Sequence, residues 1–193
     1  MAKLNLFSLH LTSTSRTLST HAVTTMFDPT PAAELLLAAR HPGEQLSAMP
    51  PSVAPSTPVE AYAVQDHLVR RLVQDLGPAV GYKIGCTTPV MQRFLGISNP
   101  CAGGVFNTST NYIATTVEFE KYSHPGVECE IAAFIGQDLV PGGGPFNRES
   151  VAPAVSALFG AIEIVDDRWT DYKAVDTPSL IADDFFASGI VLS

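Results

Sequence analysis

Two Glu-x-Glu pairs, Glu118/Glu120 and Glu128/Glu130, lie ten residues apart in a chain of 193 residues. In a β-strand, residues two apart point to the same face, so each pair would project two carboxylates about 7 Å apart at the backbone. Around the first pair, polar and apolar residues alternate and the polar turn 121–125 follows, which indicates a half-exposed strand. Around the second pair, both faces are apolar, which indicates a buried strand.

Two like charges on a buried face are unfavourable unless a cation neutralises them, because each desolvated carboxylate costs several kcal/mol. A divalent ion with oxygen ligands would neutralise Glu128 and Glu130, and it would require a third carboxylate from another element. Glu163 is the candidate, because it interrupts the otherwise apolar run 161–165. The alternative is that Glu163 pairs with a buried lysine or arginine, and the spacing alone does not separate the two.

Lys83 lies in the run Gly81-Tyr82-Lys83-Ile84-Gly85, where a lysine is unexpected in a strand between two glycines. Glycines allow close approach of the backbone. An inward ammonium group would balance the acidic cluster or hold an anionic substrate. The alternative is a surface lysine whose alkyl stem covers apolar surface while its charge stays in water.

The rest of the chain divides into segments that predict an α+β or mixed fold. Helical patterns cover 30–43, 57–77, 89–95 and 148–159, and the second of these begins with a Thr57-Pro58-Val59-Glu60 capping box. Strand-like runs cover 79–84, 112–119, 126–135, 161–165 and the apolar end of the chain. Residues 1–25 are predicted to be a disordered or leader-like extension, either a transit-type leader or an over-extended start. Residues 26–77 are predicted to be an N-terminal helical region, and 78–193 an incomplete β-region that carries the candidate catalytic residues.

The composition excludes several classes of protein. Hydrophobic residues make up 46% of the chain and charged residues 16%, which excludes disorder over the whole length. The net charge of -8 gives no positive field that would attract nucleic acid. The sequence contains no run of eighteen apolar residues, so it does not predict a membrane span. The three cysteines form neither an even set nor a closely spaced pair, which favours a reducing, cytoplasmic location.

Taken together, several segments resemble the 2-keto-4-pentenoate hydratase family of the fumarylacetoacetate hydrolase superfamily. The matching segments are Gly81-Tyr82-Lys83-Ile84-Gly85 with Thr87-Thr88-Pro89, Gly126 to Ala132, Ala161 to Arg168, Ala182-Asp183-Asp184, and Ala187-Ser188-Gly189. The resemblance runs from about Met26 to Ser193. It implies a mixed β-barrel-like roll preceded by N-terminal helices, with a Mg²⁺ or Mn²⁺ site inside it.

The resemblance also implies roles for individual residues. Glu128, Glu130 and Glu163 match the three metal ligands, and Lys83 matches the active-site lysine. A 2-oxo acid chelates such an ion through its carboxylate and keto oxygens, and the ion stabilises negative charge at the 2-oxygen. A hydratase of this kind would add water to 2-hydroxypenta-2,4-dienoate, a step in aromatic-compound catabolism. Ser188 would donate a hydrogen bond to the substrate or to the water.

The chain departs from the family pattern at three places. Asn107-Thr108 follow Gly103-Gly104-Val105-Phe106, where hydratases often carry acidic residues, and this departure counts against water-activating chemistry. Asp184 stands where Asn is common. The family continues beyond the Gly-Ile-Val-Leu strand with further β-structure, so we expect an incomplete roll with an uncovered sheet edge that recruits other chains into a homo-oligomer.

Three functions are therefore compatible with the sequence. The first is a metal-dependent hydratase. The second is a 2-oxo-3-hexenedioate decarboxylase, or another enzyme that breaks a C–C bond in a 2-oxo acid. The third is an inactive truncated fragment, which at most binds metal or joins an oligomer.

Overall fold

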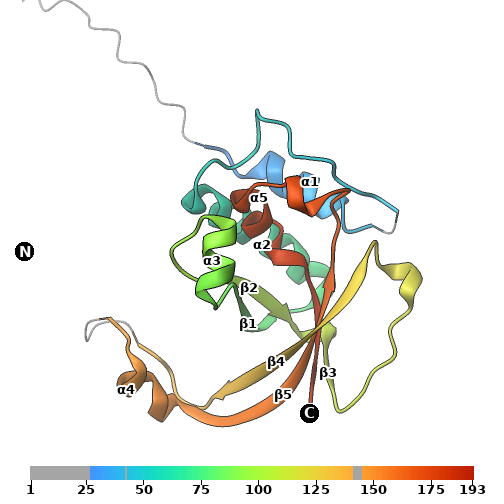
Figure 1. Cartoon of the computed structure of the whole chain (residues 1–193). Coiled ribbons are helices and arrows are strands. Elements are labelled where there is room, and N and C mark those ends of the chain that lie inside the picture. The colour runs from blue at the N-terminus through green and yellow to red at the C-terminus, as the bar shows by residue number, and fades with distance from the viewer. Residues whose placement is uncertain (1–26, 42, 141–144) are drawn as a thin grey trace, which may run out of the picture.

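The computed structural model describes residues 27–41, 43–140 and 145–193. Its helices, shown in Figure 1, are α1 (Thr30–Ala38), α2 (Pro58–Leu76), α3 (Pro89–Leu95), α4 (Arg148–Val151) and α5 (Thr177–Ala182). Its strands are β1 (Ala79–Gly85), β2 (Cys101–Phe106), β3 (Thr110–Tyr112), β4 (Pro125–Ile135), β5 (Val155–Asp166) and β6 (Ala187–Leu192). Single 3₁₀ turns occupy Asn107–Ser109, Phe119–Lys121, Ala152–Ala154, Tyr172–Ala174 and Asp184–Phe186.

The strands form two sheets. Strands β1 and β2 pair antiparallel, with Lys83 opposite Gly103. The other four form one mixed sheet in the order β3-β6-β5-β4, in which only the β3–β6 pair is parallel. The expected class of mixed sheets with helices is confirmed, whereas the described strands do not close into a roll.

The helices begin where the sequence places capping signals. The Thr57 side chain accepts the Glu60 backbone N–H at the start of α2, and the Thr88 side chain accepts the Met91 backbone N–H at the start of α3. Proline is the first residue of both helices, where its missing N–H costs nothing. The predictions for 57–77 and 89–95 are confirmed, and α1 ends slightly before the expected Pro42-Gly43.

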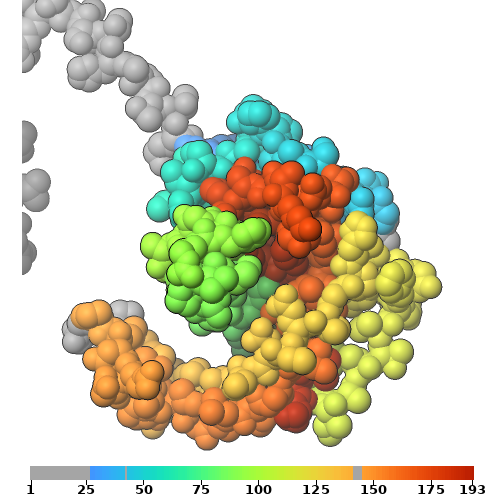
Figure 2. Space-filling view, in the orientation of Figure 1, coloured from blue at the N-terminus to red at the C-terminus, as the bar shows by residue number. Residues whose placement is uncertain are grey.

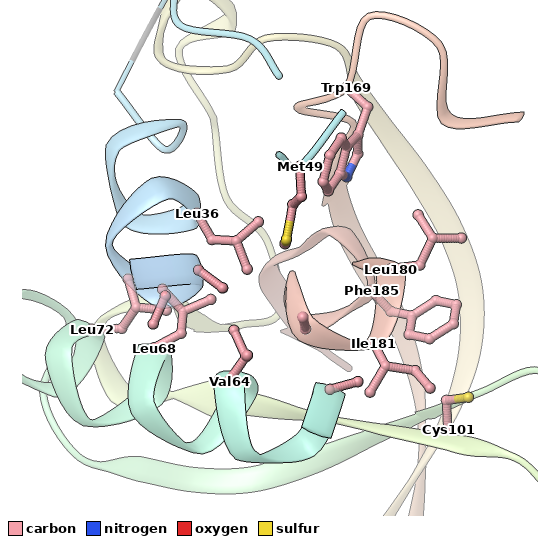
Figure 3. Close-up of a cluster of buried hydrophobic side chains, with 14 of the residues drawn as sticks. Leu36, Met49, Val64, Leu68, Leu72, Cys101, Trp169, Leu180, Ile181 and Phe185 are labelled. Atoms are coloured by element: carbon pink, nitrogen blue, oxygen red, sulfur yellow. The ribbon is translucent and has the colours of Figure 1, made fainter. Parts of the chain in front are cut away.

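The hydrophobic core lies between α1, α2 and α5. Leu36, Leu68 and Ile181 bring one buried side chain from each of these helices, and Trp169 covers them from the segment after β5 (Figure 3). Each of these side chains is almost fully excluded from water. Burial of a large apolar side chain contributes about 1.5–3 kcal/mol, so this cluster holds the helices together and carries the loop that follows α5.

The secondary structure differs from the sequence predictions at three places. The run 112–119 is a strand only up to Tyr112, and an irregular segment follows. The helix expected over 148–159 ends at Val151, because Val155 begins the long strand β5. Strand β2 was not predicted, because its glycines weaken the strand pattern.

Strands β4 and β5 extend beyond the core as a long curved arm that ends near α4 (Figure 1). The space-filling view shows an open hollow between this arm and α3 (Figure 2). Val127, Ile131 and Leu158 are exposed on the arm, so the expectation that both faces of 126–135 are buried is wrong for the described chain. The cause is the position of β4 at the edge of its sheet, where most of its residues are exposed in the described part of the chain.

Strand β6 lies inside the sheet, between β5 and β3. The apolar strand predicted at the end of the chain is thus confirmed, and it is not itself an edge of the described sheet, whereas β4 is. The predicted extension 1–25 lies outside the described residues, and the division at residue 77 stays a prediction. Within the described chain, no helix is long and apolar enough to cross a membrane.

Candidate metal centre

The register between β4 and β5 brings three glutamates together. Glu128 lies directly opposite Glu163, and Glu130 lies two residues further along the same face of β4. Each of the three can offer a carboxylate oxygen such that all three oxygens lie within 4.8 Å of one another. The convergence expected from the sequence is therefore observed.

The three carboxylates differ in exposure. Glu163 is 8% exposed, whereas Glu128 and Glu130 on the edge strand are exposed. Glu163 is buried because β5 has a neighbour on each side, β4 and β6, and lies against the residues around β1. The expectation of two buried charges on β4 is wrong, and the buried carboxylate is the one on the central strand.

Lys83 reaches this cluster from β1. Its Nζ lies 2.6 Å from Glu163 Oε1 and donates to the backbone carbonyl of Phe185 at 2.5 Å. Both side chains of the Lys83–Glu163 ion pair are largely buried. The alternative of a surface lysine is therefore wrong, and Glu163 combines both of its predicted environments, an ion pair and a carboxylate cluster.

The cluster carries more negative than positive charge. The pKa of Glu163 is raised above its ordinary value. Burial is the largest cause and the charges of Glu128 and Glu130 add to it, while the Lys83 ammonium only partly offsets them. One ammonium group faces three carboxylates, so a further cation would stabilise the ionised state of the group. Three converging carboxylate oxygens are the donor set that Mg²⁺, Mn²⁺ or Ca²⁺ prefers, and these residues fit such an ion.

The first Glu-x-Glu pair does not take part. Glu118 and Glu120 are exposed, and Glu118 forms a surface ion pair of 3.1 Å with Lys121. They lie in a loop and a 3₁₀ turn instead of the expected strand. The prediction that this pair is solvated is nevertheless confirmed.

Ser188 lies at an irregular position of β6, between the residues that pair with Ile164 and Val165. Its hydroxyl accepts from the Arg168 guanidinium at 3.5 Å. The contacts of the described residues do not join Ser188 to the three glutamates or to Lys83. Its catalytic role stays a prediction.

Two buried aspartates were not assigned a role by the sequence. Asp183 accepts from Arg40 at 2.6 Å, from Arg168 at 3.3 Å and from the Trp169 indole N–H at 3.2 Å. This network fixes the loop after α5 to the core. Asp184 is fully buried, and its Oδ1 accepts the Gly104 backbone N–H at 2.8 Å. The signal in the sequence is an acidic pair inside the apolar run 180–186.

Comparisons with known proteins agree with this geometry. No family model matches the sequence. A 2-keto-4-pentenoate hydratase from Paraburkholderia xenovorans (strain LB400) is 32% identical over 148 residues, which cover 76% of this chain and 54% of the relative. The chain is a homologue of the 2-keto-4-pentenoate hydratases. The present chain spans about half the length of the curated relatives that it matches.

The present chain is also similar to decarboxylases. A 4-oxalocrotonate decarboxylase from a Pseudomonas species is 31% identical over 133 residues, 69% of this chain and 50% of the relative. The solved structure of 4-oxalocrotonate decarboxylase from Pseudomonas putida G7, complexed with magnesium and adipate, matches with a TM-score of 0.76 and 22% identity. The match covers 86% of this chain and 62% of that one, and it shows the shared fold. A second structure of that enzyme, with calcium and acetate, has a TM-score of 0.73 at 22% identity and covers 86% of this chain and 61% of its own.

Proposed function

We propose that this chain carries the metal centre of a hydro-lyase that adds water to a 2-hydroxydienoate or 2-oxo-enoate in aromatic-compound catabolism. The observation that carries the proposal is the convergence of Glu128, Glu130 and Glu163 next to the buried Lys83. The similarity to curated hydratases supports the reaction class.

Glu128, Glu130 and Glu163 would hold Mg²⁺ or Mn²⁺. The similar decarboxylase structures, which are complexed with magnesium and adipate or with calcium and acetate, support the binding of a divalent ion. Such an ion supplies Lewis-acid stabilisation of the negative charge that develops on the 2-oxygen of the substrate.

Lys83 would bind the substrate carboxylate or hold a proton during the reaction. Its ammonium is fixed by Glu163 and by the Phe185 carbonyl, so it is already oriented before a substrate enters. A fixed cation next to exposed carboxylates fits an anionic substrate that also needs a metal. Ser188 would donate a hydrogen bond to the substrate or to the water.

A decarboxylase for 2-oxo-3-hexenedioate is the second candidate. Asn107 and Thr108 stand where a hydratase often has acidic residues, which favours a reaction that does not need those two groups to activate water. The likeness to 4-oxalocrotonate decarboxylases in sequence and fold supports this candidate. It would use the same glutamates and the same lysine.

The test uses the purified full chain with Mg²⁺. The hydratase proposal expects 2-hydroxypenta-2,4-dienoate to give 4-hydroxy-2-oxopentanoate, and the decarboxylase candidate expects CO₂ from 2-oxo-3-hexenedioate. Glu163→Gln should abolish both turnover and the rise in melting temperature with Mg²⁺, whereas Lys83→Met should abolish turnover and retain Mg²⁺ binding. A wild-type chain that binds Mg²⁺ without any turnover would identify the inactive fragment, and a chain that does not bind it would contradict the metal centre.

We also propose that the chain self-associates in the cytoplasm. Its three cysteines are free, which supports a reducing compartment. The exposed apolar side chains on the β4–β5 arm support contact with a second copy.

A further inference from the structure

We infer that Asp184 is a positioning residue that holds the Lys83 ammonium in place, and that Gly103 provides the space in which the two side chains meet. The inference deepens the proposed function, on which it rests for the role of Lys83.

Asp184 and Lys83 approach the same point of β2. Lys83 is the cross-strand partner of Gly103. A Cβ atom at Gly103 would lie 2.8 Å from Asp184 Oδ1 and 3.1 Å from Lys83 Cγ. No side chain other than hydrogen fits there without displacing one of them, so the glycine permits their juxtaposition.

The backbone after α5 turns in an unusual way to make this contact. Asp184, Phe185 and Phe186 have φ angles of 62°, 46° and 63°, the left-handed region that non-glycine residues rarely adopt. Consecutive residues in this region persist only where the surroundings hold them. The turn directs the Phe185 carbonyl to Lys83 Nζ at 2.5 Å. The hydrogen bond from the Gly104 N–H to Asp184 Oδ1 anchors the turn to β2.

The carboxyl group of Asp184 also has an unused oxygen. Asp184 is fully buried, and among the described residues its Oδ2 has no hydrogen-bond partner. A purely structural anchor needs only Oδ1, and a buried unpaired acceptor is unfavourable. The charged groups that act on this carboxyl group are Arg40, Lys83 and Asp183. Asp183 already accepts from Arg40 at 2.6 Å, which leaves Lys83 as the cation that Asp184 can stabilise.

This arrangement gives Lys83 support that does not depend on Glu163. Lys83 has Glu163 and Phe185 as its hydrogen-bond acceptors. If Glu163 also binds a metal ion, its negative charge is shared between that ion and the Lys83 ammonium. The Phe185 carbonyl, which the turn at Asp184 presents, would then keep the Lys83 ammonium in position.

The experiment compares Asp184→Ala, Asp184→Asn and Gly103→Ala in the full chain. The first measurement is the rate at which acetic anhydride acetylates Lys83, followed by peptide mass spectrometry. Asp184→Ala and Gly103→Ala should each raise this rate about tenfold, the factor expected when a charged group loses one hydrogen bond. Asp184→Asn keeps the acceptor for the Gly104 N–H but removes the negative charge that acts on Lys83, so it should raise the rate by less than Asp184→Ala does.

The second measurement is turnover with Mg²⁺. Asp184→Ala should lower kcat by about 10- to 100-fold, the cost of a misplaced catalytic group, and should change KM much less. Mg²⁺ affinity should stay at the wild-type value, because the three glutamates are intact. Leu68→Ala is the control, because it destabilises the core without touching Lys83.

The outcomes separate this inference from the proposed function. If Asp184→Ala fails to fold, Gly103→Ala decides. If Asp184→Ala and Gly103→Ala both fold and acetylate Lys83 at the wild-type rate, the positioning role is wrong. It is also wrong if Leu68→Ala raises the acetylation rate of Lys83 as much as these two variants do. Acetylation does not require turnover, so a wild-type chain without activity would contradict the proposed function and still test the role of Asp184.

Discussion

The carboxyl group of Asp184 links the local geometry of the site to the stability of the whole fold. Burial raises its pKa from 3.8 to about 6, and the Gly104 N–H only partly offsets this. Because the folded state binds this proton more tightly than the unfolded state, the contribution to stability is complete below about pH 4 and is lost as pH rises through 6. The loss amounts to about 3 kcal/mol at 1.36 kcal/mol per pKa unit.

Asp184→Asn should remove this pH dependence. We expect its free energy of unfolding to exceed that of the wild type by about 3 kcal/mol at pH 7.5, with the difference disappearing near pH 4. Urea denaturation at the two pH values measures the effect. Asp176→Asn is the control, because Asp176 is exposed and caps α5 through an oxygen that asparagine retains. The same difference at both pH values would contradict the titration of Asp184.

The three thiol groups should differ in reactivity. Cys101 is 3% exposed, and burial raises its pKa to about 11, so very little thiolate forms at neutral pH. Cys129 lies exposed on β4. Iodoacetamide at pH 7.5 should therefore alkylate Cys129 first and Cys101 last, which peptide mass spectrometry can follow. Equal rates for Cys101 and Cys129 would contradict the described burial.

At the level of elements, the sequence predicts the helices whose ends depend on local chemistry. Both α2 and α3 start at a threonine cap followed by proline, and their boundaries follow from these residues alone. The segment 148–159 was predicted incorrectly because its apolar spacing also fits a strand. Pairing of β5 with β4 and β6 decides that case, and such contacts between distant segments do not appear in a local pattern.

The cap of α2 can be tested directly. Thr57→Ala removes the acceptor of the Glu60 N–H and should lower the free energy of unfolding by about 1 kcal/mol. Thr57→Ser keeps the hydroxyl and should lose much less. Thermal and urea denaturation of the two variants measure the difference, and equal stability would mean that the cap contributes little.

At the level of the whole molecule, the site was predictable in part. The alternation along β4 places Glu128 and Glu130 on one face, and the charge inside the run 161–165 identifies Glu163. Their convergence depends on the register of β4 against β5, and the contact with Lys83 joins residues eighty positions apart. The role of Asp184 was not predictable, because it depends on a left-handed turn and on a glycine in a different strand.

The exposed face of the β4–β5 arm is where the whole molecule should meet another copy. Val127 and Ile131 lie on the face opposite the glutamates and are 75% and 77% exposed. Val127 lines an apolar groove of about 330 Å³ together with Ile162 and Ile164. β4 is also a long strand at the edge of its sheet, and an exposed apolar edge strand pairs readily with another chain.

We therefore expect the full chain to sediment as an oligomer whose fraction rises with protein concentration. Ile131→Lys should weaken this association by about tenfold or more, since it places a charge at the centre of the apolar face. Val59→Lys is the matched control, because Val59 is 81% exposed on α2, away from the arm. Sedimentation velocity over a range of concentrations measures both variants. A wild-type chain that stays monomeric, or an oligomer that Ile131→Lys leaves unchanged, would show that copies do not meet at this face.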